Sequence, residues 1–247
     1  MLRKRLVTIL TFFEGVLYRS KNFTPDYRYT ANFVDAWSID EVILLDISRP
    51  ERRNRAQFLD IVSQFAERTF VPLCVGGGIN SLEDFKDYLV AGADKVAVNT
   101  LALVQPNLVT EAANRFGSQC VVVSIDVRKC DSGYQVYGNC GRDKTGWNVT
   151  EFASYVQKLG AGEILLTSID KDGSLEGFDL ELSQSIASVV DIPVIISGGA
   201  GKWQDFVDGF NVGGADAVGT TNIYHFSESS IKSAKQYLSK HNINIRK

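Results

Sequence analysis

Eight short apolar runs alternate with helical segments along the chain, and this alternation restricts the fold more than any other feature. The runs occupy residues 6–10, 41–47, 71–77, 95–100, 120–126, 162–170, 192–199 and 216–221. Runs that are apolar throughout are typical of parallel strands that helices cover. Helices are expected between these runs, for example over 81–92, 148–160 and 179–190. The pattern therefore predicts an α/β protein with a parallel sheet.

The two halves of the chain also resemble each other. VPLCVGGGINSLEDF at 71–85 matches IPVIISGGAGKWQDF at 192–206, and AGADKVAVNT at 91–100 matches GGADAVGTT at 213–221. Two copies of a four-unit βα segment predict a closed (βα)8 TIM barrel with an internal half-barrel repeat, whose chemistry lies at the carboxyl ends of the strands. An open doubly wound sheet is the alternative, but that fold does not require two equivalent halves. No stretch resembles a linker, so residues 1–247 are expected to form one domain.

Composition and charge exclude several classes of protein. The net charge of −3 argues against nucleic-acid binding through a strongly positive surface. No apolar run reaches the ~18 residues of a membrane span, and the apolar N-terminal run has no cleavage site after it, so neither membrane insertion nor a signal peptide is expected. The four cysteines form no CxxC pair and only two histidines are present, which predicts no metal site and no cofactor. Reduced thiols in a cytoplasmic protein are the expectation.

Glycine-rich turns follow equivalent strands in the two halves. VGGGI ends the third apolar run and SGGAG ends the seventh, while VNT and GTT end the fourth and the eighth. Glycine lets the backbone approach a ligand closely, and N–H groups at helix starts bind phosphate. Each half therefore offers one anion-binding cup, built from Gly78, Asn99 and Thr100 in the first and from Gly199, Thr220 and Thr221 in the second. Two such cups predict a long, phosphorylated small-molecule ligand, although tight turns also use glycine.

Several motifs together resemble one enzyme family. They are VGGGI, GADKV, GSQCVVVSID, GRDKTG, GAGEILLTSIDKDG, DLEL and SGGAGKWQDF. The chain is similar through them to the cyclase subunit of imidazole glycerol phosphate synthase, from residue 3 to the C-terminus and most densely after about residue 70. A sister isomerase of histidine biosynthesis shares much of the pattern, but GAGEILLTSIDKDG favours the cyclase. The resemblance implies a (βα)8 barrel that receives ammonia from a separate glutaminase subunit, adds it to a ribulosyl substrate with two phosphates, cleaves that substrate and closes an imidazole ring.

The resemblance also implies roles for individual residues. The family's general acid/base on the fifth strand falls on Asp126. Its phosphate contacts fall on the cup residues already named and on Asp172 and Gly173. Its second essential acid, at the end of the first strand, falls on Thr11, and the lysine of the first loop is replaced by Arg19. Because threonine does not titrate in the useful range, this replacement predicts impaired cyclisation.

Four charged residues begin predicted strands: Arg5, Glu41, Lys95 and Glu163. In the family these positions form a charged ring that gates the ammonia tunnel beside the glutaminase. A salt-bridge plug that only seals the barrel end is the alternative.

An intact ammonia route with an altered first strand resembles one branch of the family. Barrel subunits of that branch belong to bacterial surface-glycan (lipopolysaccharide) pathways, pair with a glutaminase, and help a third enzyme, a sugar amidotransferase, to form an amidine. We therefore expect an ammonia-channelling subunit of this kind, in a heterodimer with a glutaminase. The ordinary histidine-pathway cyclase and a non-catalytic scaffold that activates the glutaminase are the alternatives.

The segment SRPERRNR at 48–55 follows the second strand on the expected catalytic face. Its four arginines, Arg49, Arg52, Arg53 and Arg55, could recognise a nucleotide-sugar diphosphate or an acidic partner. The other interpretation is a solvated loop whose arginines pair with Glu51 and Asp60.

Overall fold

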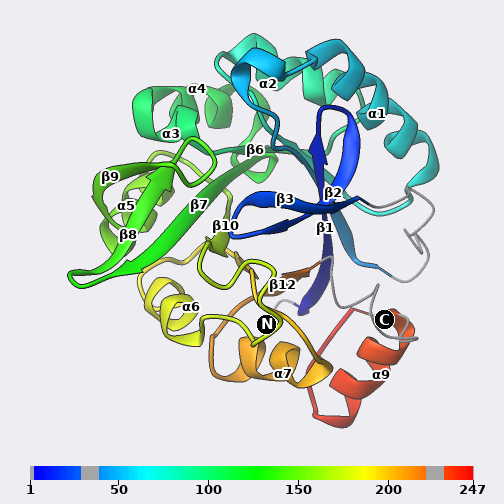
Figure 1. Cartoon of the computed structure of the whole chain (residues 1–247), viewed down its shortest axis with the longest axis vertical. Helices are drawn as coiled ribbons and strands as arrows, with labels where there is room; N and C mark the ends of the chain where they lie inside the picture. Colours follow the sequence, from blue (N-terminus) through cyan, green and yellow to red (C-terminus); the bar gives the residue numbers. More distant parts are fainter. Residues whose placement is uncertain (1–2, 29–38, 221–230, 247) are drawn as a thin grey trace.

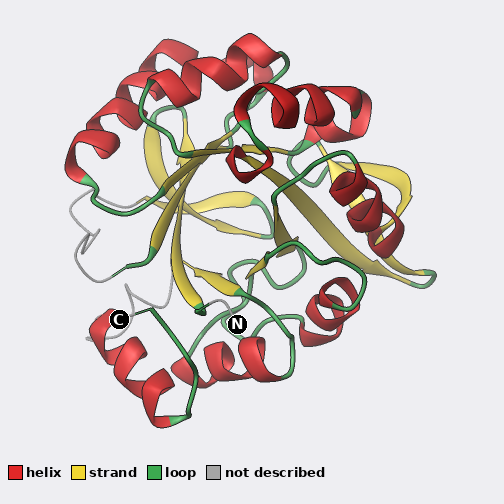
Figure 2. Ribbon diagram, turned by 180° about the vertical axis from the view of Figure 1, so that it is seen from behind, coloured by secondary structure: helices red, strands yellow, loops and turns green. Residues whose placement is uncertain are grey.

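The computed structural model describes residues 3–28, 39–220 and 231–246, and within them eight parallel strands close into a barrel (Figures 1 and 2). In order around the barrel they are β1 (Arg5–Phe13), β4 (Glu41–Asp46), β5 (Leu73–Gly76), β6 (Lys95–Val98), β7 (Val121–Cys130), β10 (Glu163–Ser168), β11 (Val194–Ser197) and β12 (Ala217–Thr220). The pairing of β7 with β10 closes the sheet into a ring. The predicted (βα)8 barrel is thus confirmed.

Helices between the strands form the outer layer of the barrel (Figure 2). They are α1 (Arg55–Arg68), α2 (Leu82–Val90), α3 (Thr100–Val104), α4 (Asn107–Phe116), α5 (Val149–Lys158), α6 (Leu180–Ala187), α7 (Trp203–Asn211) and α9 (Ile231–Lys240). Short side chains fix several N-termini, because Ser81 and Asp179 each accept a hydrogen bond from a backbone N–H of the first helical turn. The predicted helices at 81–92, 148–160 and 179–190 correspond to α2, α5 and α6.

The core has two layers, because successive side chains of a strand point to opposite faces. On β1, Leu6 packs outward against the helices, whereas Val7 points into the barrel. The barrel interior holds a compact apolar layer: Val7, Ile9, Ile43, Cys74, Ala97, Val122, Leu165, Ile195 and Ala217. Strands buried on both faces in this way explain why the sequence shows continuous apolar runs.

Two antiparallel excursions extend the barrel strands at their carboxyl ends. The first, β2 (Val16–Lys21) and β3 (Thr24–Arg28), continues from β1 and lies across the barrel in Figure 1. The second, β8 (Gly133–Gly138) and β9 (Asp143–Asn148), continues from β7 and projects to one side. The apolar runs did not predict these strands, because most of their residues are polar or only partly buried.

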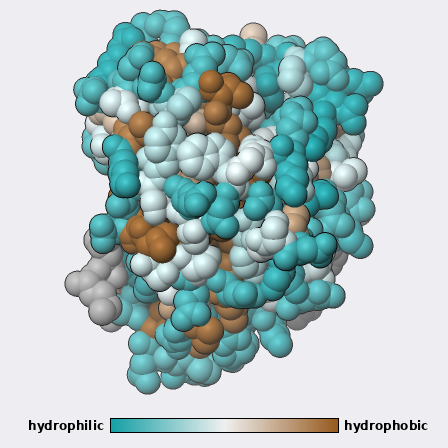
Figure 3. Space-filling view, turned by 90° about the vertical axis from the view of Figure 1, so that its left-hand side faces the viewer, coloured by the Kyte–Doolittle hydropathy of each residue, from teal (hydrophilic) through white to brown (hydrophobic). Residues whose placement is uncertain are grey.

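The surface carries few large exposed apolar residues in the described part of the chain. They are Phe70, Val90, Val104, Leu175, Val189 and Val212. On the face that Figure 3 shows, hydrophobic residues lie scattered among hydrophilic ones. None of the helices formed by the described residues has both the length and the apolar character that a membrane span requires.

Candidate active site

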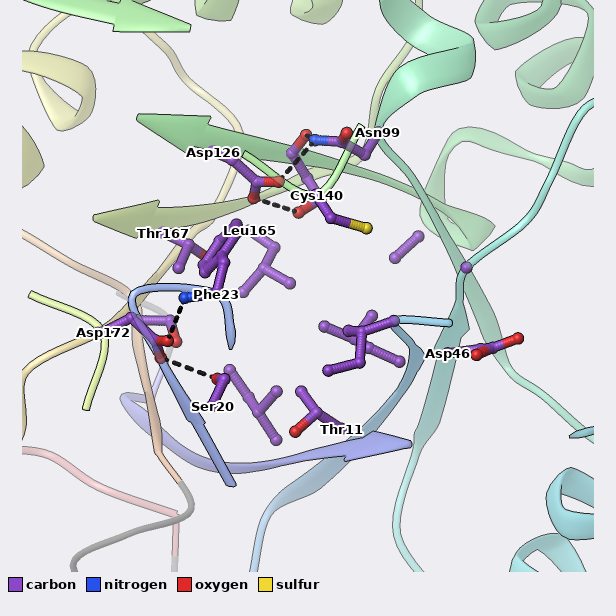
Figure 4. A pocket seen from close by; sticks show the side chains of 18 of the residues that line it. Thr11, Ser20, Phe23, Asp46, Asn99, Asp126, Cys140, Leu165, Thr167 and Asp172 are labelled. Carbon is purple, nitrogen blue, oxygen red and sulfur yellow. Dashed lines mark hydrogen bonds between the residues drawn. The ribbon is translucent and has the colours of Figure 1, made fainter. Parts of the chain in front are cut away.

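The carboxyl ends of all eight barrel strands surround a cavity of about 270 Å³, and the β2–β3 hairpin forms part of its wall (Figure 4). Nine of the ten residues predicted for catalysis or phosphate binding line it: Thr11, Gly78, Asn99, Thr100, Asp126, Asp172, Gly173, Gly199 and Thr220. The tenth, Thr221, lies outside the described residues. Residues from both halves of the chain therefore meet in one cavity.

Asp126 lies on β7, on the opposite side of the cavity from Thr11 (Figure 4). Its carboxylate accepts hydrogen bonds from Asn99 Nδ2 at 3.2 Å and from Ser124 Oγ at 3.4 Å. Burial raises the pKa of Asp126 to about 7; the hydrogen bond from Ser124 opposes the rise, and the charge of Asp172 adds to it. A carboxyl group that exchanges its proton near neutral pH is suited to general acid/base catalysis.

Thr11 has a structural hydrogen bond instead of a free polar group. Its hydroxyl donates to the backbone carbonyl oxygen of Tyr18, its cross-strand partner on β2. The side chain therefore ties the β2–β3 hairpin to β1. It supplies no titratable group opposite Asp126.

The first cup lies where β5 and β6 end. Gly78 has a φ of +67°, which favours glycine, and the side chain of Arg53 lies against it. Asn99 Nδ2 also donates to the carbonyl oxygen of Ser124 at 2.9 Å. Thr100 Oγ1 accepts from the backbone N–H of Asn139 at 3.1 Å. In this cup, then, Asn99 orients Asp126, and Thr100 contacts the β8–β9 turn.

The second cup lies where β11 and β12 end. Gly199 has a φ of +109°, and its carbonyl oxygen accepts from the backbone N–H of Gly177 at 2.8 Å. A Cβ on Gly199 would lie 2.1 Å from the carbonyl oxygen of Gly177, so no other residue fits there without movement. Thr220 is buried at the end of β12.

Asp172 and Gly173 hold the β2–β3 hairpin over the cavity. The Asp172 carboxylate accepts from the backbone N–H of Phe23 at 3.0 Å and from Ser20 Oγ at 3.1 Å. Burial raises its pKa, while these two hydrogen bonds oppose the rise. A Cβ on Gly173 would lie 2.7 Å from the carbonyl oxygen of Ser20, so glycine permits this close contact.

At the opposite end of the barrel, the four predicted gate residues form a closed ionic ring. Lys95 Nζ lies 2.8 Å from Glu41 and 2.7 Å from Glu163, and Arg5 donates to the same two carboxylates. Burial raises the pKa of Glu41, and the nearby charge of Glu163 adds to the rise. Burial opposes the charge on Arg5 and Lys95, but the two carboxylates outweigh it and raise both pKa values.

The arginines of the 48–55 segment do not take the partners that the solvated-loop interpretation named. Arg52 pairs with Glu14 at 3.0 Å, and Arg53 pairs with the buried Asp46 at 3.0 Å. Arg55 pairs with Asp84 and Asp87, each at 3.1 Å. Pairing with Glu51 and Asp60 was wrong, because the fold brings other carboxylates closer to these arginines: Glu14, Asp46, Asp84 and Asp87.

Two further cavity residues lie outside the catalytic and phosphate-binding positions that the sequence predicted. Cys140 lines the wall near Asp126 with a φ of +56°, and burial raises the pKa of its thiol. Arg53 lines the wall beside Gly78. The arginine-rich segment was the available signal for Arg53, whereas a lone cysteine in a polar turn gave none. No group of three or more potential metal ligands occurs among the residues that the structure describes.

Comparison with known proteins identifies the family. The model of the histidine biosynthesis protein family matches residues 8–230. The chain is 45% identical to "Imidazole glycerol phosphate synthase subunit HisF" of Clostridium botulinum, strain Okra, and the alignment covers the whole length of both proteins. It is 44% identical to the protein of that name from Bacillus subtilis and 43% identical to that of Anoxybacillus flavithermus, again over the full length of each. The chain therefore belongs to the histidine biosynthesis protein family, and within it to the HisF subunits of imidazole glycerol phosphate synthase.

Proposed function

We propose that this chain is the synthase subunit of a glutamine-dependent enzyme, in which a glutaminase partner releases ammonia at one end of the barrel and the ammonia reacts in the cavity at the other. The observation that carries the proposal is the position of Asp126. A buried carboxyl group with a pKa of about 7 faces a cavity that has a glycine-rich cup on each half of its wall. That arrangement suits a long substrate with an anionic group at each end and proton transfer in the middle.

The ionic ring supports the location of the ammonia entrance. Four charged side chains that pair across the barrel axis cover one end of the apolar interior layer. Ammonia is small and uncharged, so apolar surroundings favour it over ammonium. The layer includes the short side chains of Cys74, Ala97 and Ala217. Passage requires the ring to open, which suits a gate that responds to a docked glutaminase.

The names of the relatives favour one ammonia acceptor, the substrate from which imidazole glycerol phosphate is made. The three relatives described above carry the name "Imidazole glycerol phosphate synthase subunit HisF". The proposed reaction is therefore the addition of ammonia to the two-phosphate ribulosyl substrate, with cleavage and closure of the imidazole ring. Asp126 is the general acid/base of this proposal, and the two cups hold the phosphates.

Thr11 favours a second candidate function. Its hydroxyl is engaged by Tyr18 and its side chain carries no titratable proton, so proton transfer on that side of the substrate has no protein carboxylate on β1. An amidine-forming role in surface-glycan synthesis, with a third amidotransferase enzyme as the ammonia acceptor, needs the barrel to conduct ammonia but does not need the cyclisation.

Genetic complementation tests the proposal. The chain and its cognate glutaminase are expressed together in a histidine auxotroph that lacks its own cyclase. Growth without histidine is expected for the cyclase, and the Asp126→Asn variant should abolish it. No growth, with a folded chain that still stimulates glutamine hydrolysis by its partner, would favour the glycan function. If the chain neither supports growth nor affects glutamine hydrolysis, the ammonia-conducting role itself is wrong.

A further inference from the structure

We propose that Arg53 is a further ligand contact of the first cup, where it binds the phosphate monoester of the substrate and makes this cup bind phosphate more tightly than the second. This inference rests on the proposed function, because it names the ligand chemistry of one end of the same cavity. It concerns a residue that the glycine motifs do not include. It also predicts which end of a two-phosphate substrate binds more tightly.

The guanidinium group of Arg53 is held rigidly at the cavity wall. Its Nε donates to Asp46 Oδ2 at 3.0 Å, and its Nη2 donates to the carbonyl oxygen of Ser48 at 2.6 Å. Asp46 is itself 5% exposed, so this anchor is shielded from solvent. A guanidinium that is already oriented loses little conformational freedom when it binds an anion.

The third nitrogen of this group lies at the first cup. Arg53 Nη1 makes no hydrogen bond with any of the described residues. A Cβ built on Gly78 would lie 2.7 Å from this nitrogen, so the nitrogen lies directly beside the glycine. Glycine at position 78 thus accommodates Arg53 as well as the turn. Arg53, Gly78 and Asn80 together line the same part of the cavity.

The backbone N–H of Asn80 at the first cup already has a partner, so a side-chain donor adds to what the cup offers a ligand. The N–H of Asn80 already donates to Asp84 Oδ2 at 2.8 Å, because Asp84 caps this turn. The equivalent N–H in the second half, that of Gly201, donates to Asp205 Oδ2 at 2.8 Å. Neither N–H is free for a ligand. The first cup therefore gains from Arg53 a charge-assisted donor that its backbone does not provide.

The second cup has no arginine at the matching place. There, a Cβ built on Gly199 would lie 2.1 Å from the carbonyl oxygen of Gly177 and 3.2 Å from the Cβ of Lys171, whose Nζ pairs with Glu176 at 3.4 Å. A carbonyl oxygen repels an anion, whereas a guanidinium attracts it. Asp46 compensates one positive charge, and Asp84 and Ser81 already accept backbone N–H groups at the start of α2, so the added affinity for phosphate comes from the hydrogen bonds that Nη1 can donate.

Direct anion titration tests this role without the partner or any turnover. Inorganic phosphate is titrated into the wild-type chain and into Arg53→Gln, with Kd followed by calorimetry or by ³¹P NMR. Arg52→Gln is the matched control, because Arg52 lies on the same segment, pairs with Glu14 and is largely exposed. Loss of a charge-assisted hydrogen bond should weaken phosphate binding about 10- to 100-fold in Arg53→Gln, with Kd within about twofold of wild type in Arg52→Gln.

Two further arms keep the result decisive. Arg53→Lys keeps the charge but not the planar geometry, so an intermediate phosphate affinity is expected. This variant replaces Arg53→Gln if the latter does not fold.

Ribose 5-phosphate and UDP are titrated beside inorganic phosphate. The affinity for ribose 5-phosphate, a monoester, should depend on Arg53, and UDP should not bind more tightly than the monoester. Equal phosphate affinities in folded Arg53→Gln and Arg52→Gln, no phosphate binding by the wild type, or a preference for UDP would each overturn the inference. Loss of synthase activity in a chain that still binds phosphate through Arg53 would refute only the proposed function.

Discussion

The two halves of the barrel share their supporting contacts but differ where they meet a ligand. The N–H of Leu73 donates to Asp94 Oδ2 at 2.8 Å in the first half, and that of Val194 donates to Asp216 Oδ2 at 3.2 Å in the second. The backbone N–H groups of Val42 and Ile164 each donate to a proline carbonyl oxygen at 3.0 Å. These repeated contacts join neighbouring strands, so both halves keep them for stability.

At the ligand end, some equivalent positions have diverged, although glycine is kept at both 78 and 199. Asp126 of the second half faces Thr11 of the first, and the guanidinium beside Gly78 has a backbone carbonyl as its counterpart beside Gly199. In the ionic ring each half supplies one acid, Glu41 or Glu163, whereas both cations come from the first half. Both halves therefore keep the hydrogen bonds that join the barrel strands, while the side chains at the two ends of the barrel have specialised.

Substitution of Asp126, the carboxyl group that the first half lacks at the end of β1, should reduce turnover more than any other change. Asp126→Asn should lower ammonia-dependent turnover about 10²- to 10⁴-fold, because general acid/base catalysis contributes an effect of this size. Turnover with excess ammonium salt measures it without the glutaminase. Asp131→Asn makes the same chemical change at an exposed position and should leave turnover unaltered. Comparable turnover in the two variants would remove Asp126 from the chemistry.

Lys95 tests the asymmetry of the ring, since the equivalent position in the second half is Ala217. Lys95→Met should lower the free energy of unfolding by about 3–5 kcal/mol, because it leaves two buried carboxylates with Arg5 as their remaining ring cation. Urea unfolding measures the change. The double variant Lys95→Met with Glu163→Gln removes one of those carboxylates and should recover part of the loss. A single-variant cost below about 1 kcal/mol would show that the ring is not a coupled unit.

The raised pKa of Asp126 also predicts how stability depends on pH. The native carboxyl group, with a pKa of about 7, binds more protons between pH 4 and 7 than the unfolded one, whose ordinary pKa is 3.8. Its contribution to stability is therefore complete below about pH 4 and is lost as the pH rises through about 7. Asp126→Asn removes this dependence, so relative to the wild type it should gain about 2–4 kcal/mol between pH 4 and 8. The unfolding free energies of the wild type and Asp126→Asn are compared at pH 4 and at pH 8. The same difference between the two proteins at both pH values would contradict the raised pKa of Asp126.

Thr11→Asp tests whether the missing carboxylate limits cyclisation. The variant places an acid on β1 opposite Asp126, and we expect cyclase turnover to rise about 10- to 100-fold. Thr11→Asn has a similar shape without the charge, so it should not produce this rise. Both variants lose the hydrogen bond to Tyr18, and their melting temperatures report that common loss. If wild-type turnover is already high and Thr11→Asp does not increase it, the second carboxylate is dispensable here.

The sequence predicted the barrel well, because periodic apolar runs and an internal repeat form it. Continuous apolar runs follow from strands buried on both faces, and the repeat of glycine turns placed the cavity residues at one end. It did not predict the β2–β3 and β8–β9 excursions, which have little buried apolar pattern. It did not predict that Asp172 holds the β2–β3 hairpin or that Arg53 lies against Gly78. Each of these contacts joins two separate loops, which meet only through the fold.

Asp94 and Asp216 make equivalent hydrogen bonds in the two halves, and their substitution tests whether these bonds stabilise both halves equally. Asp94→Ala and Asp216→Ala each remove a carboxylate that accepts from the first backbone N–H of a barrel strand. Each should lower the free energy of unfolding by about 1–2 kcal/mol, the cost of a lost hydrogen bond to a charged group. Asp191→Ala, at an exposed position, is the control and should cost less than about 0.5 kcal/mol. The two costs should agree within about 0.5 kcal/mol, because the Lys4 pair of Asp216 is partly exposed and adds little. A difference above about 1 kcal/mol would show that one half supports the barrel more than the other, and the specialisation would then extend from the ligand end to these hydrogen bonds.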